Sequence, residues 1–179
     1  MPIETETPRL RGVDPPLWDG RPLLGSYLLR RDRCVVELSV RPWFRARLTA
    51  FSGSLEIGYA AGENELTAEL DTSSLWTNVP LLAGKLAGRA REFPVISFAG
   101  TEPGFAGDAP EITGRVECGG TSRELRLHGA PWRVERARII VWVRGVLPPP
   151  RQRARGAGPV LDAILRRPLH VEVAAEFLR

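Results

Sequence analysis

The stretch that decides the fold is residues 111–128, EITGRVECGGTSRELRLH. Polar and apolar residues alternate on both sides of a Gly-Gly pair, with Ile112 and Val116 in the first run and Leu125 and Leu127 in the second. A period of two is typical of a strand that turns one face to an apolar core and the other to water. Residues 118–122 have the length and composition of a hairpin turn. The stretch therefore predicts two antiparallel strands with one buried face.

The same alternation recurs along the rest of the chain and predicts further strands. Many alternating strands joined by hairpins indicate an all-β protein, either a closed antiparallel barrel or a sandwich. A closed barrel removes the exposed strand edges, and an eight-stranded one has an interior wide enough for one small or elongated ligand. The additional predicted strands cover residues 25–31, 34–40, 53–59, 65–71, 95–98, 137–145 and 169–177.

Two segments predict short helices. Residues 79–90 follow Thr77-Asn78 and carry Pro80 early in the first turn, which fits a helix start. Residues 159–166 place four apolar side chains on one stripe and are followed by Pro168. The fold class predicted from these elements is all-β, with one or two short helices.

Composition limits the classes of protein that the chain can belong to. It has 179 residues, which suits one domain, and a net charge of +4 that is spread over many arginines and is too small to indicate nucleic-acid binding. No apolar run is long enough for a transmembrane helix. Residues 1–22 include five prolines and lack a signal-peptide pattern, so they predict a flexible leader before a barrel domain at 23–179. The default location for such a chain is the cytoplasm.

The sequence nominates no catalytic residue, metal site or cofactor. His128 and His170 fall on the polar phase of their strands, whereas Cys118 falls on the apolar phase, so these side chains are not expected to converge on a metal. No nucleophile-elbow, phosphate-loop or dinucleotide motif is present. Asp71, Tyr59 and Arg47 are the only residues that could be named as candidates under an enzyme hypothesis. For Asp71 the competing interpretation is a turn residue without a catalytic role.

What remains is an apolar interior. From the sequence alone, a packed core and a ligand cavity look the same. The residues expected to line a pore lie on the inward phase of the strands, and four more are expected to shape its mouth. The pore set is Val36, Leu38, Leu55, Ile57, Leu66, Leu70, Ile96, Phe98, Val116, Leu125, Val141 and Val173, and the mouth set is Leu75, Trp76, Leu82 and Leu86.

From about Gly25 to Phe177 the order of segments resembles the YceI-like family. The resemblance is carried by residues 27–30 and 34–41, then 44–53 (FRARLTAFSG), 74–78 (SLWTN), 93–98 (FPVISF), 114–125 (GRVECGGTSREL) and 171–177 (VEVAAEF). No single segment is specific, and their order and spacing together are moderately specific. The resemblance implies a closed or nearly closed, eight-stranded lipocalin-like barrel whose apolar pore holds an isoprenoid or similar lipid tail.

The chain departs from the family pattern at several polar positions. Arg33-Cys34 stands where the family has a histidine-serine pair, and Pro42 replaces a second histidine. The charged helical segment that the family places near the pore mouth is here Leu82 to Leu86, LAGKL. These changes affect the residues that would meet a ligand's head group, and they favour either a more apolar mouth or a helix that faces a partner.

The function predicted from this reasoning is non-enzymatic binding or carriage of a lipid-like ligand. The first alternative is a partner-binding or regulatory barrel, supported by Ile140 and Trp142 on an outward phase, by Trp132, and by the cluster Arg151, Arg153 and Arg155. It leaves a homodimer open. The second alternative is an enzyme on a small apolar substrate. An apolar small molecule is the expected partner, and nucleic acid is not.

Overall fold

A computed structural model of the chain describes residues 17–18, 21–59, 63–101, 104–106, 109–129, 133–135, 137–150 and 158–179. Most of the predicted leader over residues 1–22 lies outside these ranges. Two short strands within it, β1 (Leu17–Trp18) and β2 (Arg21–Pro22), pair with each other as a separate two-stranded sheet.

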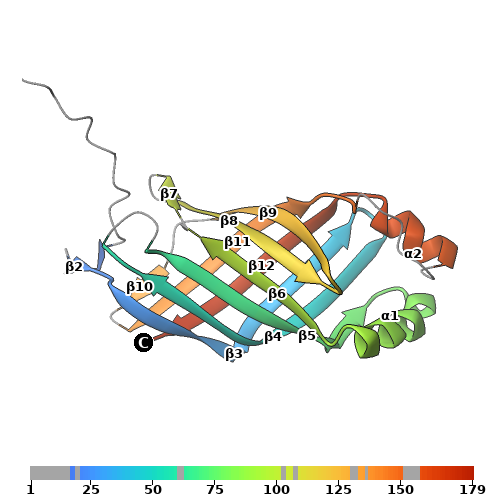
Figure 1. Cartoon of the computed structure of the whole chain (residues 1–179), viewed down its shortest axis with the longest axis horizontal. Coiled ribbons are helices and arrows are strands. Elements are labelled where there is room, and N and C mark those ends of the chain that lie inside the picture. Colours follow the sequence, from blue (N-terminus) through green and yellow to red (C-terminus); the bar gives the residue numbers. More distant parts are fainter. Residues whose placement is uncertain are drawn as a thin grey trace, which may run out of the picture.

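Eight strands form a closed antiparallel barrel, as the alternation predicts (Figure 1). Each strand pairs with its neighbours in the order β11-β12-β3-β4-β5-β6-β8-β9, and β9 returns to β11. Closure leaves every one of these strands with a partner on both sides, so none presents a full unpaired edge. The strands are β3 (Gly25–Val40), β4 (Phe44–Ile57), β5 (Glu65–Thr77), β6 (Val95–Thr101), β8 (Ala109–Cys118), β9 (Thr121–Gly129), β11 (Arg138–Leu147) and β12 (Leu169–Leu178).

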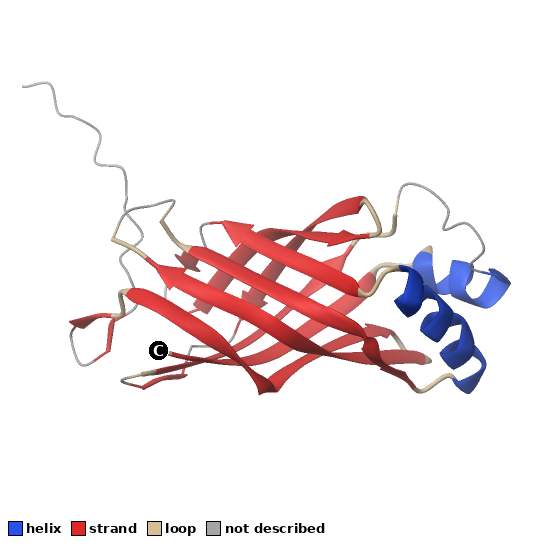
Figure 2. Cartoon of the chain, turned by 60° about the horizontal axis from the view of Figure 1, so that its bottom comes forward, coloured by secondary structure: helices blue, strands red, loops and turns tan. Residues whose placement is uncertain are grey.

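Short elements extend the barrel at its ends. Strand β7 (Gly104–Ala106) pairs with β8, and β10 (Arg133–Glu135) pairs with β11. The two predicted helices form as α1 (Pro80–Glu92) and α2 (Gly158–Leu165), and both lie at the same end of the barrel (Figures 1 and 2). We call this end the helix end.

The predicted hairpin of residues 111–128 forms as β8 and β9. Ile112 pairs with Leu127 and Gly114 with Leu125, and these positions face the interior. Gly119 and Gly120 form the turn with φ angles of 56° and 74°, a region that glycine enters without a steric penalty.

The predicted strands 25–31 and 34–40 are one long strand, β3, with an irregularity in the middle. Tyr27 is buried before it and Cys34 after it, so the inward phase changes from odd to even residue numbers. The register shift between Leu28 and Val35 accounts for this change. Because the irregularity interrupts the period of two, alternation alone divides β3 into two strands.

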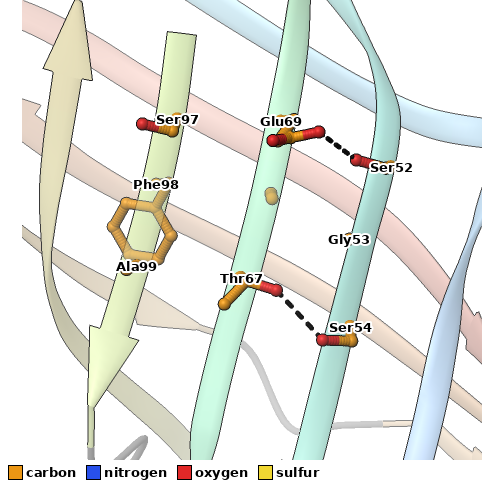
Figure 3. Close-up of a pocket in the computed structure, with 9 residues that line it drawn as sticks. Ser52, Gly53, Ser54, Thr67, Glu69, Ser97, Phe98 and Ala99 are labelled. Atoms are coloured by element: carbon orange, nitrogen blue, oxygen red, sulfur yellow. Dashed lines mark hydrogen bonds between the residues drawn. The ribbon is translucent and has the colours of Figure 1, made fainter.

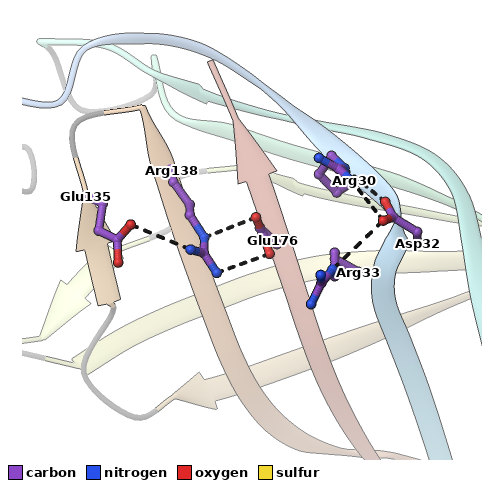
Figure 4. A network of polar contacts seen from close by, with 6 residues as sticks. All are labelled: Arg30, Asp32, Arg33, Glu135, Arg138 and Glu176. Carbon is purple, nitrogen blue, oxygen red and sulfur yellow. Dashed lines mark hydrogen bonds and ion pairs between the residues drawn. The ribbon is translucent and has the colours of Figure 1, made fainter.

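Charged side chains cover the outer surface around this irregularity (Figure 4). Asp32 accepts two hydrogen bonds from the Arg30 guanidinium, at 2.9 and 2.8 Å. On the neighbouring strands, the Arg138 guanidinium lies 3.0 Å from Glu176 and 3.5 Å from Glu135. These pairs place the charges outside the barrel and leave the inner face to apolar side chains.

Strand β4 extends well before the predicted segment 53–59. Phe44 and Leu48 are buried in its first half, and Leu55 and Ile57 in its second half. The change from even to odd numbers follows a register shift between residues 50 and 52. The first half of β4 was expected only as part of the family resemblance, because the shift again breaks the alternation.

Among the described residues, three paired positions between β9 and β11 close the barrel, and we call them the closure seam. They are Gly129 with Val143, His128 with Arg144 and Leu127 with Gly145. A Cβ atom on Gly145 would stand 2.1 Å from the carbonyl oxygen of Arg126. Only glycine therefore lets the two strands approach to hydrogen-bonding distance here.

Replacing Gly145 with alanine should weaken the closure seam, because the added methyl group forces the two backbones apart. We expect Gly145→Ala to lower the free energy of unfolding by about 1–3 kcal/mol in urea titration. The control is Gly84→Ala in α1, where a Cβ meets nothing within 4 Å and should raise the stability by about 0.5–1 kcal/mol. Equal stability of Gly145→Ala and the parent would show that β9 and β11 can accommodate a methyl group without losing their pairing.

Candidate functional site

The inner surface of the barrel is apolar, and it contains nearly all of the residues expected to line a pore or its mouth. Fifteen of the sixteen belong to one apolar cluster. Buried members are Val36, Leu55, Ile57, Leu66, Leu82, Leu125 and Val141, and partly buried members are Leu38, Leu70, Leu75, Leu86, Ile96, Phe98, Val116 and Val173.

Trp76 is the exception to this set. Its side chain is 56% exposed, and it pairs with the exposed Arg47 on the neighbouring strand. The register between β4 and β5 shifts between Arg47 and Thr49. This shift changes which residues of the last part of β5 face outward, and alternation from Leu66 cannot anticipate it.

A group of inward side chains on β5, β6 and β8 forms what we call the partly buried wall. Leu70 pairs with Ile96 and Phe98 with Val116, so these four inward side chains are adjacent on β5, β6 and β8, and all are only partly buried. Elsewhere in the barrel Val141 is 3% exposed, whereas Leu38 of β3 and Val173 of β12 are partly buried as well. Inward apolar side chains that keep accessible surface are the candidates for contact with a ligand in the interior.

Gly114 is a small inward residue beside this wall. A Cβ on Gly114 would stand 2.4 Å from Cζ of Phe98, so the Phe98 ring already occupies the space above that glycine. Gly114 therefore accommodates packing. Ile96 and Val116, which are also partly buried, lie closer to the helix end.

The two helices cover the helix end of the barrel (Figure 2). Leu82 of α1 and Leu161 and Ile164 of α2 are buried in the core cluster. Lys85 lies against the start of α2, because a Cβ on Gly158 would stand 2.3 Å from its Nζ atom. The helices are thus adjacent, and each inserts apolar side chains into the barrel.

Buried Thr72 fixes the C-terminal end of α1. Its hydroxyl lies 2.7 Å from the carbonyl oxygen of Phe93 and 3.2 Å from that of Ala90, and it can donate to either. The backbone N–H of Thr72 donates to the carbonyl oxygen of Pro94 at 3.1 Å. These bonds satisfy carbonyl groups that a helix C-terminus leaves unpaired.

The opposite end of the barrel is filled by side chains. Leu23, Tyr27, Ile112 and Ile139 are buried there, with at most 5% exposure. The Tyr27 hydroxyl has no hydrogen-bond partner among the described residues, and burial raises the pKa of this phenol. Buried apolar side chains are therefore found at both ends of the barrel.

Arg123 is an inward-facing residue that the sequence reasoning missed. It pairs with Val116 and shares the face of Leu125 and Leu127, close to the helix end. Its Nη1 atom donates to the carbonyl oxygen of Pro148 at 3.0 Å, and desolvation lowers the pKa of its guanidinium. Alternation could have identified it, because Arg123 is separated from the buried Leu125 and Leu127 by even numbers of residues and so lies on the same face of β9.

Cys118 accompanies Arg123 on the inner face of the same hairpin. Burial raises the pKa of its thiol, while the charges of Arg123 and Arg89 act in the other direction. The thiol is therefore neutral at pH 7. His128 lies on the outer face beside Glu111, and Cys118 on the inner face, as predicted.

The structure does not bring the three enzyme candidates together. Arg47 is bound to Glu37 at 3.1 Å on the outer face, whereas Tyr59 is exposed beyond the far end of β4. Asp71 accepts hydrogen bonds from the backbone and hydroxyl of Ser73, and these bonds lower the pKa of its carboxyl. Asp71 thus organises the local backbone, the competing interpretation from sequence.

A shallow depression of about 500 Å³ crosses β4, β5 and β6 (Figure 3). Its polar side chains form pairs: Ser52 donates to Glu69 at 2.7 Å, and the hydroxyls of Ser54 and Thr67 are 3.0 Å apart. Gly53 and Ala68 are also among its lining residues. Because these hydroxyl groups are bound to one another, the depression is a weaker candidate for a ligand site than the interior.

The residues behind the partner-binding alternative are only partly described. Trp142 is 59% exposed, and its indole N–H donates to Glu172 at 2.7 Å. It pairs with Ala174, which in turn pairs with the exposed Val35, so a narrow apolar strip crosses the outer face. Trp132 and the cluster Arg151, Arg153 and Arg155 lie outside the described residues.

Comparison with solved structures finds the same fold. BcnA of Burkholderia cenocepacia matches with a TM-score of 0.64 at 14% identity, over 83% of this chain and 98% of that one. A polyisoprenoid binding domain from Saccharophagus degradans, implicated in plant cell wall breakdown, matches with a TM-score of 0.50 at 15% identity, over 87% and 98%. The likeness to the YceI-like family is thereby confirmed in the fold.

Comparisons at the level of sequence add nothing to this likeness. No family model matches the chain, and no curated protein matches it. Within the described residues, neither helix has the length and apolar character that crossing a membrane requires.

Thr72 supplies a test of how α1 is held over the barrel. Thr72→Val keeps the shape of the side chain but removes the hydroxyl, which leaves the carbonyls of Ala90 and Phe93 without this donor. We expect a loss of about 1–3 kcal/mol in the free energy of unfolding, whereas Thr72→Ser should lose less than about 1 kcal/mol. Similar losses in the two variants would argue against the hydroxyl as the anchor.

Tyr27 gives a pH-dependent prediction. Because its pKa is raised in the folded state, the unfolded chain loses the phenol proton first as the pH rises above about 10, and stability falls in that range. Tyr27→Phe should reduce this alkaline loss and, since the hydroxyl has no partner, should leave stability at pH 7 unchanged or about 1 kcal/mol higher. Tyr59→Phe, at an exposed tyrosine, is the control. An identical dependence of stability on pH in both variants would show that Tyr27 is not the source of the alkaline loss.

Proposed function

We propose that the chain binds a long apolar, lipid-like molecule, such as an isoprenoid, inside the barrel and does not change it chemically. The observation that carries this proposal is the closed apolar interior with one partly buried wall, formed by Leu70, Ile96, Phe98 and Val116. An apolar chain placed against this wall would bury surface that the protein alone leaves accessible, at a gain of about 25 cal/mol per Å².

The comparisons support the same proposal. One of the two matched structures is described as a polyisoprenoid binding domain, and it shares the barrel with this chain. The candidate polar groups support binding rather than catalysis, since Arg47, Tyr59 and Asp71 lie apart and the carboxyl of Asp71 is held ionised by Ser73.

A second candidate function is a partner-binding module, which the strip of Trp142, Ala174 and Val35 favours. The partner would be another protein or a second copy of this chain. Light scattering tests the second case. A monomer at all concentrations would count against a homodimer, and a dimer dissociated by Trp142→Lys would support it.

The ligand proposal is tested by filling the space beside the wall. Geranylgeraniol, an uncharged isoprenoid alcohol, serves as the probe, and binding is followed by native mass spectrometry and by tryptophan fluorescence. We expect Ile96→Trp to weaken its binding at least about tenfold, because the larger side chain occupies the space that the probe needs.

The neighbouring position supplies the matched control. Val95 is next to Ile96 on β6 but is 37% exposed on the outer face, so Val95→Trp should leave the affinity within about twofold. Circular dichroism establishes that both variants are folded. No binding to the parent protein, or equal binding by both variants, would rule out an interior site.

A further inference from the structure

Arg123 is a charged residue on the otherwise apolar inner face of the barrel. Among the described residues that are paired in the eight strands, it is the one charged side chain on the inward face, where its partners are Val116 across the hairpin and Leu125 two residues on. Arginine stays protonated under all ordinary conditions, so a positive charge stands on the inward phase of β9, in a side chain that is partly buried. A charge removed from water is unfavourable unless it is paired.

Its surroundings in the described structure do not neutralise this charge. The guanidinium donates one hydrogen bond, to the carbonyl oxygen of Pro148, and no carboxylate within ion-pair distance is found among the described residues. The acidic neighbours Glu117 and Glu124 pair with Ser122 and Arg115 on the outer face. Desolvation lowers the pKa of Arg123, as expected for a cation that lacks a counter-charge.

The position of Arg123 relative to the partly buried wall is also specific. It pairs with Val116, which pairs with Phe98, so the guanidinium and the wall are continuous across β9, β8 and β6. Arg123 lies toward the helix end, where Pro148 follows the last residue of β11. An elongated molecule lying along the wall would therefore have one end beside the guanidinium.

We propose that the ligand is an amphiphile with an anionic head, a phosphate or a carboxylate, which binds Arg123 at the helix end while its apolar tail lies along the wall of Leu70, Ile96, Phe98 and Val116. This inference rests on the proposed lipid-binding function and adds the chemistry of the head group. The planar guanidinium fork suits an oxyanion, and the four N–H groups that do not bind Pro148 are available to it.

The test compares two probes that differ only in the head group. Geranylgeranyl monophosphate carries the anion, and geranylgeraniol carries a hydroxyl on the same tail. Titration of the parent protein should show at least about tenfold tighter binding of the monophosphate, the effect of one charge-assisted contact away from bulk water. Inorganic phosphate alone should neither bind at millimolar concentration nor displace the monophosphate.

Substitutions assign the preference to the residue. Arg123→Met keeps an unbranched apolar stem and should abolish the preference for monophosphate while leaving geranylgeraniol binding within about threefold. Arg123→Lys should retain part of the preference. Arg126→Met is the matched control, because Arg126 lies on the outer face of the same strand, paired to Glu124 at 3.0 Å, and it should leave the preference unchanged.

The outcomes separate this inference from the proposed function. If geranylgeraniol fails to bind the folded parent protein, the proposed function fails and the inference fails with it. If geranylgeraniol binds but the monophosphate binds no more tightly, or if the preference survives Arg123→Met, only the inference is overturned. Binding of inorganic phosphate as tight as that of the monophosphate would point to a free-anion site and would also overturn it.

Discussion

The closure seam between β9 and β11 is the interaction on which the rest of the structure depends. Three paired positions join the last two strands of the ring, and Gly145 allows their close approach because any larger residue would collide with the carbonyl oxygen of Arg126. Without this pairing the sheet would be open, and its apolar face would have to find another surface to cover it. With it, the same face becomes an interior.

The two ends of the interior differ. Side chains such as Tyr27 and Ile112 fill one end, whereas α1 and α2 cover the other and are held there partly by Thr72. The partly buried wall of Leu70, Ile96, Phe98 and Val116 runs toward Arg123. An apolar chain with a charged end matches this asymmetry better than a uniformly apolar or a compact polar molecule.

The sequence predicts the barrel well because half-buried strands have a period of two, and the hairpin predicted at residues 111–128 forms. It predicts β3 and β4 less well, because register shifts reverse the inward phase in mid-strand, at Leu28 to Val35 and at residues 50–52. Trp76 turns outward for the same reason. Alternation places Arg123 on the same face as Leu125 and Leu127, but an arginine is not expected among the apolar residues of an inner face. Whether an interior is loosely packed depends on how side chains meet across it, which alternation does not encode.

The most direct test of the central claim, that the barrel is a container for an apolar chain, is native mass spectrometry of the protein purified without organic solvent. The account predicts a species heavier than the apo-chain by the mass of a long-chain molecule, which disappears after organic extraction and returns when an isoprenoid probe is added. A spectrum that shows the apo-chain alone, both before extraction and after addition of the probe, would contradict it.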